Sequence, residues 1–564
     1  MAVTPELEAP LQAEAVEERP RPAPPAAPDA RASVWPWVRL AALLVVALAS
    51  ELVYIVFWPL SYLLTQAVDF TYEYLVEFPA AWERLVPLVA RLEELWPGST
   101  GSLDILVDLL VRTFVVAFML YLAAFFLTRA GLPSGWGAVA VLAPPLAFQI
   151  TLFTMPGLFT TDMFSYATYG QIAGVYGVSP YTHLPSAFPE FRILSWIHPL
   201  WHDAPSIYGP AWVDLTRPLA RTINGWSDVD KILAYKLVTN VGHLASVACI
   251  GYIAHRLRPG RALEAIVLYA WSPLILFEFA GNGHNDAVMI AVMLLAVASY
   301  VSGSRWLGMV ALTVSFLIKM TSVLLVPYYA MAWARDQRDW LRFFGIGVGA
   351  VATVLTVIVA FYWPWWEGVQ TIGPILLWSQ GPMFNNYVPD ILAIQLASRR
   401  LAESGGTLDP ALALDQTRDL VKSVARLVLI GIGIWELWQA RGALGMIGSG
   451  ARLMLAFLLI VNTWVLPWYF TWPIALAVLL GWESLTTKVL IGFSISAPTV
   501  MYYHHFWHPY MSDSTYLFYV LPLAIAPLVW IGSLLVWLLR RVSRRVVAST
   551  AARKAPLSVA DVRQ

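Results

Sequence analysis

The apolar runs of this chain decide what it can fold into, because several approach the length needed to cross a lipid bilayer. An α-helix needs about 20 apolar residues to span the hydrocarbon core. Hydrophobic residues make up 59% of the 564 residues and charged residues 13%, about half the charged share of a soluble domain. The sequence therefore predicts an all-α, polytopic membrane protein with about 12–14 transmembrane helices and external loops that carry short amphipathic helices.

Charge and cysteine content exclude several classes of partner and site. The net charge is zero, so charge indicates no nucleic-acid partner. Cys249 is the one cysteine in the sequence, which excludes an internal disulfide and a cysteine metal cluster. His504, His505 and His508 resemble a metal cluster, but no acidic residue lies among them. With HEXXH, Walker and GXSXG motifs also absent, we predict neither a metal nor a cofactor.

Basic residues predict the orientation of the chain. Arg39 lies at the start of the first apolar run, and four arginines between positions 540 and 545 follow the last. Loops rich in Lys and Arg tend to face the cytoplasm, so both termini are predicted to be cytoplasmic. We expect a disordered tail at 1–33, a transmembrane domain at 34–545 and a second cytoplasmic tail at 546–564.

Ten apolar runs predict single spans, and two more regions predict hairpins. A continuous crossing from Trp306 to Trp333 would put the following arginines outside, so we expect two short helices that meet near Lys319. The region around the sequence TWVLPWY shows the same pattern between Arg452 and Lys488. The loops 65–103, 156–230 and 363–417 are predicted to be external. The expected single spans are 37–64, 104–127, 136–155, 232–257, 263–280, 287–301, 341–362, 420–439, 489–503 and 516–539.

Polar and aromatic residues are concentrated between positions 160 and 210, in TTDMFSYATYGQIAGVYGVSPYTH and SIYGP. Asp162 is the carboxylate at the start of this stretch, and a carboxylate among tyrosine and histidine donors is typical of a sugar or phosphate site. Two simpler explanations stay open. Asp162 can be a helix N-cap, and tyrosines also favour membrane interfaces. The predicted substrate-binding residues here are Tyr166, Tyr169, His183 and Tyr208.

A second polar cluster, GNGHNDA, lies between two predicted spans. Capping explains one Asn or Asp at such a position, but four polar residues within five positions exceed what one cap needs. We therefore expect His284, Asn285 and Asp286 to contact substrate.

Lys319 is a lysine within an apolar run, where a charge is costly unless it faces a partner or a water-filled cavity. Snorkelling of its side chain to the membrane surface is the alternative. At the tip of a hairpin, Lys319 would face an anionic phosphate. Trp468 and Tyr469 lie at the tip of the second hairpin and are predicted to bind substrate as well.

Four blocks carry a resemblance to a known family: the stretch from TTDMFSYATYG to SIYGPAW, then GNGHNDAVMIAVMLLA, LIKMTSVLLVP and VLPWYFTWP. In this order, they make the chain similar to GT-C integral-membrane glycosyltransferases. The chain particularly resembles bacterial polyprenyl-phosphate-mannose-dependent α-mannosyltransferases that extend cell-envelope glycans. The resemblance implies a lipid-phosphate sugar donor used from the external face, an inverting mechanism, and Asp162 as the base. Many members carry two adjacent acidic residues, whereas Met163 follows Asp162 here.

We therefore predict a hexosyltransferase of the bacterial cell membrane with an extracytoplasmic active site. It would move a sugar, most simply mannose, from a polyprenyl-phosphate donor to a glycan or glycolipid acceptor by a single inverting displacement, in contact with membrane lipids. The alternative is a transporter or flippase of a lipid-linked sugar. That alternative predicts internal repeats and ionisable groups near the bilayer midplane, and the two hairpins are the one repeated feature found.

Overall fold

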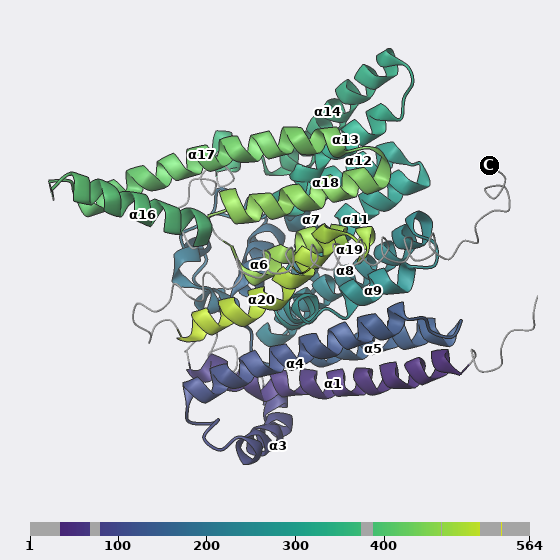
Figure 1. Ribbon diagram of the computed structural model, residues 1–564. Helices are drawn as coiled ribbons and strands as arrows, with labels where there is room; N and C mark the ends of the chain where they lie inside the picture. The colour runs from purple at the N-terminus through teal and green to yellow at the C-terminus, as the bar shows by residue number, and fades with distance from the viewer. Residues whose placement is uncertain are drawn as a thin grey trace, which may run out of the picture.

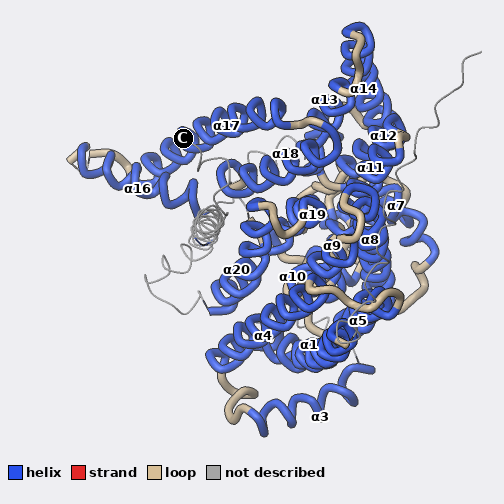
Figure 2. Tube along the Cα trace, turned by 45° about the vertical axis from the view of Figure 1, so that its right-hand side comes forward, coloured by secondary structure: helices blue, strands red, loops and turns tan. Residues whose placement is uncertain are grey.

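The structure is a computed structural model that describes residues 34–67, 79–373, 387–405, 407–463, 465–507 and 532. These residues form helices and connecting turns without a strand (Figures 1 and 2), which confirms the all-α prediction. Both predicted tails, and all of the predicted span 516–539 except residue 532, lie outside the described residues. The longer helices are α1 (Trp35–Ala67), α3 (Pro79–Leu95), α4 (Leu103–Arg129), α5 (Trp136–Phe153), α6 (Asp162–Gln171), α7 (Pro210–Thr222), α8 (Asp228–Leu257), α9 (Ala262–Ala270), α11 (Asp286–Ser302), α12 (Arg305–Ile318), α13 (Val326–Arg335), α14 (Trp340–Tyr362), α16 (Tyr387–Glu403), α17 (Pro410–Gln439), α18 (Gly442–Ala456), α19 (Thr471–Leu480) and α20 (Leu485–Trp507).

Six helical segments among the described residues are long and apolar enough to cross a membrane, and a bent pair of helices makes a seventh. This supports a multi-pass membrane protein. The predicted count of 12–14 also included shorter apolar helices, such as α11 and α12, which have 17 and 14 residues. At 1.5 Å per residue, α12 is about 21 Å long and cannot cross an ordinary bilayer by itself.

The predicted span 263–280 is a broken helix. α9 ends at Ala270, and the chain resumes as α10 (Pro273–Leu276) and a π-helical turn, Phe277–Gly281, at an angle of 53°. Pro273 explains the break, because proline lacks an N–H and disfavours helical conformation in the residue before it. The π-helical turn is followed directly by the turn that contains His284.

The first predicted hairpin is present. α12 and α13 are joined by a 3-10 turn, Met320–Leu325. The Arg305 guanidinium at the start of α12 pairs with Asp336, directly after α13, at 2.6 Å. Because the chain comes back to the end of the bundle where α12 began, Lys319 lies at the tip, as predicted from the distribution of basic residues.

The second hairpin is formed by α18 and α19, which pack against each other. Its tip meets the first tip, since the Lys319 ammonium lies 5.1 Å from the centre of the Tyr469 ring and 5.7 Å from that of Trp472. The other end of α19 lies near basic residues: Glu483, just after α19, pairs with Arg129 at the end of α4, and Arg129 also pairs with Glu264 of α9 at 3.0 Å.

The predicted external loop 156–230 folds into α6, α7 and short turns that cover the first tip. Gly209, in the SIYGP sequence, donates its N–H to the Ile318 carbonyl at 3.2 Å. A Cβ atom at Gly209 would lie 2.0 Å from the Leu317 carbonyl oxygen, so only glycine allows this close approach. The loop and both tips therefore share one end of the bundle. The arm formed by α16 and the first part of α17 extends from the bundle on this side (Figure 1), and α16 contacts the π-helical turn Phe457–Val461 that leads into the second tip.

The hairpin makes a prediction about sidedness. With Cys249 replaced by serine, Arg338→Cys after α13 and Arg256→Cys near the end of α8 should react with an impermeant thiol reagent from the same side of the membrane. Asp203→Cys, in the loop over the tips, should react from the other side. Labelling of positions 338 and 203 together in intact cells, with position 256 protected, would contradict the hairpin.

Candidate active site

The GNGHND turn connects the π-helical turn to α11 and packs against the start of α6. Gly283 has a φ of 78°, in the left-handed region that favours glycine. A Cβ atom there would lie 2.1 Å from the Met163 Cε atom. The tight turn therefore brings His284 next to Asp162, the first residue of α6.

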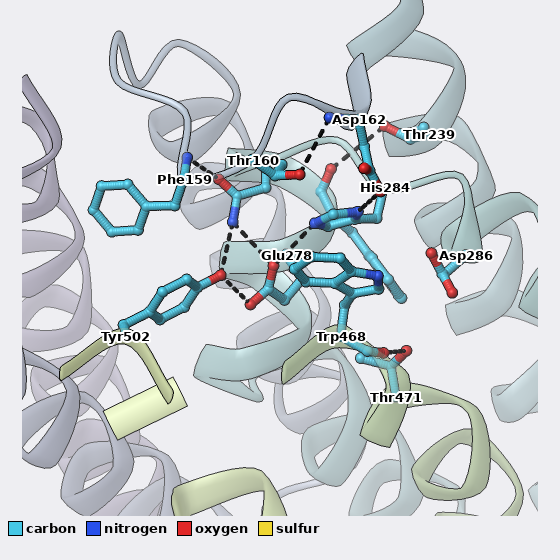
Figure 3. A network of polar contacts seen from close by, with 12 residues as sticks. Phe159, Thr160, Asp162, Thr239, Glu278, His284, Asp286, Trp468, Thr471 and Tyr502 are labelled. Atoms are coloured by element: carbon cyan, nitrogen blue, oxygen red, sulfur yellow. Dashed lines mark hydrogen bonds and ion pairs between the residues drawn. The ribbon is translucent and has the colours of Figure 1, made fainter. Parts of the chain in front are cut away.

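His284 lies between two carboxylates (Figure 3). Its Nδ1 is 3.3 Å from an Asp162 carboxylate oxygen, and its Nε2 is 3.3 Å from a Glu278 oxygen. The imidazole also stacks on the Trp468 ring, with centres 3.8 Å apart and planes 20° apart. The side chains of His284 and Glu278 are fully buried, whereas 25% of the Asp162 side chain is exposed.

Asp162 is not the N-cap of α6 in this structure. Thr161 occupies that position, and the Asp162 carboxylate contacts His284 from a different element. The backbone N–H of Asp162 donates to the Thr160 hydroxyl at 3.2 Å. Helix capping, the simpler explanation, therefore does not account for the contacts of the Asp162 carboxylate.

The charges around Asp162 keep it ionised. Burial alone would raise the pKa of the Asp162 carboxyl, but the hydrogen bond and charge of His284, with the charge of Lys319, hold this pKa below its ordinary value. Burial likewise works against protonated His284, yet Asp162 and Glu278 raise the pKa of its imidazole. The arrangement favours a carboxylate next to an imidazolium.

Lys319 and Asp286 form a second ion pair, which with Asp162, Glu278, His284, Trp468 and Trp472 makes up the cluster of the site. Lys319 Nζ lies 2.7 Å from one Asp286 oxygen, and the indole N–H of Trp472 donates to the other. Asp286 is fully buried, while 17% of the Lys319 side chain is exposed. In this arrangement Asp286 holds the ammonium in place, and the ammonium is the part of the pair that a ligand can reach.

The predicted tyrosines occupy different positions relative to this cluster. The Tyr166 hydroxyl donates to the Asn285 side-chain oxygen at 3.0 Å and accepts the Asn285 N–H at 3.2 Å, so these two buried residues brace the turn. Tyr208 packs its ring on Tyr166, with centres 4.8 Å apart. Tyr169 donates to the Ala204 carbonyl at 2.8 Å and so supports the covering loop.

His183 contacts its own loop rather than the cluster. Its Nδ1 faces the Ser179 carbonyl at 3.1 Å and the neighbouring Thr182 hydroxyl at 3.2 Å. Two residues in the cluster were not predicted from the sequence: Glu278 and Trp472. A glutamate within the apolar span 263–280 was the available signal for Glu278, since an ionisable group in such a segment usually faces the interior of the bundle.

No group of three or more His, Cys, Asp or Glu side chains that could hold a metal ion occurs in the described part of the chain. The side chains of His504 and His505, and all of His508, fall outside the description. The prediction that no metal is needed therefore stays a prediction.

The buried Asp286 makes a prediction about stability. Lys319→Met removes the charge that compensates Asp286 and should destabilise the protein by roughly 3 kcal/mol, because a carboxylate is left unpaired in a buried site. Adding Asp286→Asn should recover most of that loss. Thermal unfolding in detergent would measure both effects, with Arg112→Met, which breaks an exposed ion pair with Asp108, as a control that changes little. Equal midpoints for wild type and Lys319→Met would show that the pair does not stabilise the tip.

Comparison with known proteins places this cluster in a family context. A family model described as "Alpha-(1->6)-mannopyranosyltransferase, N-terminal domain" matches residues 95–335, which include Asp162, Glu278, His284 and Lys319. Alpha-(1->6)-mannopyranosyltransferase A of Mycobacterium tuberculosis is 24% identical over 376 residues, which cover 63% of this chain and 70% of that protein. The protein of the same name from Corynebacterium glutamicum is 22% identical over 348 residues, or 58% of this chain and 69% of that protein. These matches support the resemblance found in the sequence: over residues 95–335 the chain is similar to proteins described as alpha-(1->6)-mannopyranosyltransferases.

Proposed function

We propose that this chain transfers a mannosyl group from a polyprenyl-phosphate donor to a glycan or glycolipid acceptor, with Asp162 as the base. The observation that carries the proposal is the exposure of the three carboxylates in the cluster. Glu278 and Asp286 are fully buried, whereas a quarter of the Asp162 side chain is accessible. A general base must come within hydrogen-bond reach of the hydroxyl that it deprotonates, and Asp162 has the access that this requires.

The reaction is a single displacement at the anomeric carbon of the donor. The acceptor hydroxyl gives its proton to the Asp162 carboxylate as its oxygen forms a bond to that carbon. The bond between the anomeric carbon and the phosphate oxygen breaks on the opposite face. The polyprenyl phosphate leaves with the electron pair, so the configuration at the carbon inverts.

Lys319 is suited to bind the phosphate that leaves. An ammonium group has three donors, and Asp286 accepts one of them at 2.7 Å, so two remain for phosphate oxygens. A fixed positive charge close to developing negative charge stabilises the transition state. Its charge also acts on Asp162, so one cation serves both the base and the leaving group.

Orientation supports an extracytoplasmic reaction. Arg39 in α1 donates to the Gly131 carbonyl, just beyond α4, at 3.2 Å, and the ion pairs of Arg129 lie at the same end of that helix. Basic residues favour the cytoplasmic side, so the N-terminal end of α1 belongs there. The end with the hairpin tips and Asp162 then faces outward.

One observation favours a transporter or flippase of a lipid-linked sugar instead. Broken helices that meet inside a bundle are typical of transporters, and the tips near Lys319 and Trp468 are of this kind. The proteins matched by sequence, however, are named as transferases. Sugar transfer in detergent, where no membrane separates two compartments, is expected of the transferase and not of a transporter.

Replacement of the base gives the sharpest test. Asp162→Asn keeps the size of the side chain and an oxygen that can accept from His284, but an amide does not take up the proton. Base catalysis contributes about 10²–10⁴-fold, so turnover should fall by that order. Purified variants would be incubated with labelled polyprenyl-phosphate mannose and candidate acceptors, and donor binding would be measured separately.

Asp203→Asn is a matched control, because Asp203 lies in the same covering loop and accepts the Ser186 hydroxyl at 2.6 Å, outside the cluster. It should transfer mannose at close to the wild-type rate. If Asp162→Asn does so as well, Asp162 is not the base. If the wild-type protein shows no transfer from this donor to any acceptor, the proposed donor class is wrong.

A further inference from the structure

Glu278 is the buried carboxylate on the far side of His284 from Asp162. We infer that Glu278 is a positioning residue, which holds the His284 ring charged and fixes the backbone that leads into α6, so that Asp162 stays ionised and aligned. This inference rests on the proposed role of Asp162 as the base. Glu278 connects to Asp162 by two separate routes.

The first route passes through the imidazole. A neutral histidine has one N–H donor and one acceptor nitrogen, whereas imidazolium has two donors. Both nitrogens of His284 face carboxylate oxygens at 3.3 Å, and only imidazolium can donate from both nitrogens at once. Trp468 covers the face of the ring at 3.8 Å, where an aromatic surface also favours a cation. Glu278 thus supplies the second negative charge that keeps the positive charge beside Asp162.

The second route passes through Asn282 and the backbone. The Asn282 amide donates to Glu278 at 2.9 Å, and its oxygen accepts the N–H of Phe159 at 3.0 Å. Phe159 is followed by Thr160, whose hydroxyl accepts the N–H of Asp162. Glu278 therefore fixes the segment that immediately precedes Asp162 (Figure 3).

Tyr502 from α20 completes the surroundings of Glu278. Its hydroxyl donates to Glu278 at 2.6 Å and accepts from the Asn282 amide at 3.1 Å. A carboxylate buried among apolar helices is costly unless it is hydrogen-bonded, and this one accepts from Asn282 and Tyr502 as well as facing His284. A simpler explanation is that the network only ties α20 to the π-helical turn, and a measurement must separate the two.

The pH dependence of transfer separates them. The charged or titratable groups around Asp162 and His284 are Glu278, Asp286, Lys319, and the hydroxyls of Tyr166, Tyr208, Tyr469 and Tyr502. In Glu278→Gln, the amide can donate to Nε2 of a neutral His284. Asp162 then no longer contacts a positive charge on His284, and the negative charge of Glu278 on the far side of the ring is also gone. The nearer charge dominates, so the pKa of Asp162 rises and the acid limb of the pH–rate profile moves to higher pH.

The experiment compares initial rates of mannosyl transfer against pH for wild type and Glu278→Gln. We expect the acid limb to move upward by about one pH unit, since an opposite charge in contact typically lowers the pKa of a carboxyl by 1–3 units and loss of Glu278 offsets part of it. Glu51→Gln is the matched control: Glu51 is a partly buried carboxylate of α1 that accepts from Thr151, and its replacement should leave the limb in place. A lower rate at every pH with an unmoved limb would reduce Glu278 to a structural role and overturn the inference.

Two further variants keep the test decisive. If Glu278→Gln does not fold, Tyr502→Phe removes the hydroxyl that donates to Glu278 at 2.6 Å. Glu278 is then held less firmly beside His284, and the acid limb should again move upward; an unmoved limb overturns the inference. Asp162→Asn separates the two proposals. If that variant is inactive while the limb of the Glu278 variant is unmoved, the base stands and the role of Glu278 fails. If Asp162→Asn transfers mannose normally, the proposed base itself is wrong.

Discussion

The ion pair between Lys319 and Asp286 is the contact on which the arrangement of the site depends. α11 and α12 are joined by a tight turn at Gly303, where φ is 94°, and they run side by side. Apolar contacts alone do not determine where α12 ends beside α11, because lipid competes with neighbouring helices for such contacts. The opposite charges of Asp286, at the start of α11, and Lys319, directly after α12, supply that constraint. The pair sets the position of the first tip, and through Tyr469 and Trp472 that of the second.

The fold and the chemistry use the same breaks in the helices. Irregular backbone at membrane depth is tolerated only where it is buried in protein or lines a cavity. The breaks after Ile318, before Pro467 and at Pro273 all end near the cluster. At each break the chain leaves helical geometry, so a polar or aromatic side chain can point toward the cluster. In a continuous helix the same side chain would point elsewhere. The short helices are therefore the reason that charged side chains can converge inside this bundle.

Sequence patterns predicted these features unevenly. The hairpin at Lys319 followed from one physical rule, because a single crossing would have put Arg335 and Arg338 on the wrong side. The turn at His284 was visible as an excess of polar residues over what capping needs. Glu278 was missed because one glutamate in an apolar run gives no indication of which neighbours it faces; Pro273 and the π-helical turn decide that. His183 shows the converse, since it shares a loop with Asp162 but the loop folds it toward Ser179.

The balance of charge explains why the base would be Asp162 rather than either of its neighbours. Three carboxylates, Asp162, Glu278 and Asp286, share two cations, imidazolium at His284 and ammonium at Lys319, which leaves one net negative charge. Glu278 and Asp286 are fully buried and each accepts at least two hydrogen bonds or ion pairs. Water stabilises an uncompensated charge best where it has access, and that place is Asp162. The buried pairs thereby leave a single carboxylate that is both ionised and within reach of a hydroxyl, which are the two conditions that a general base must meet.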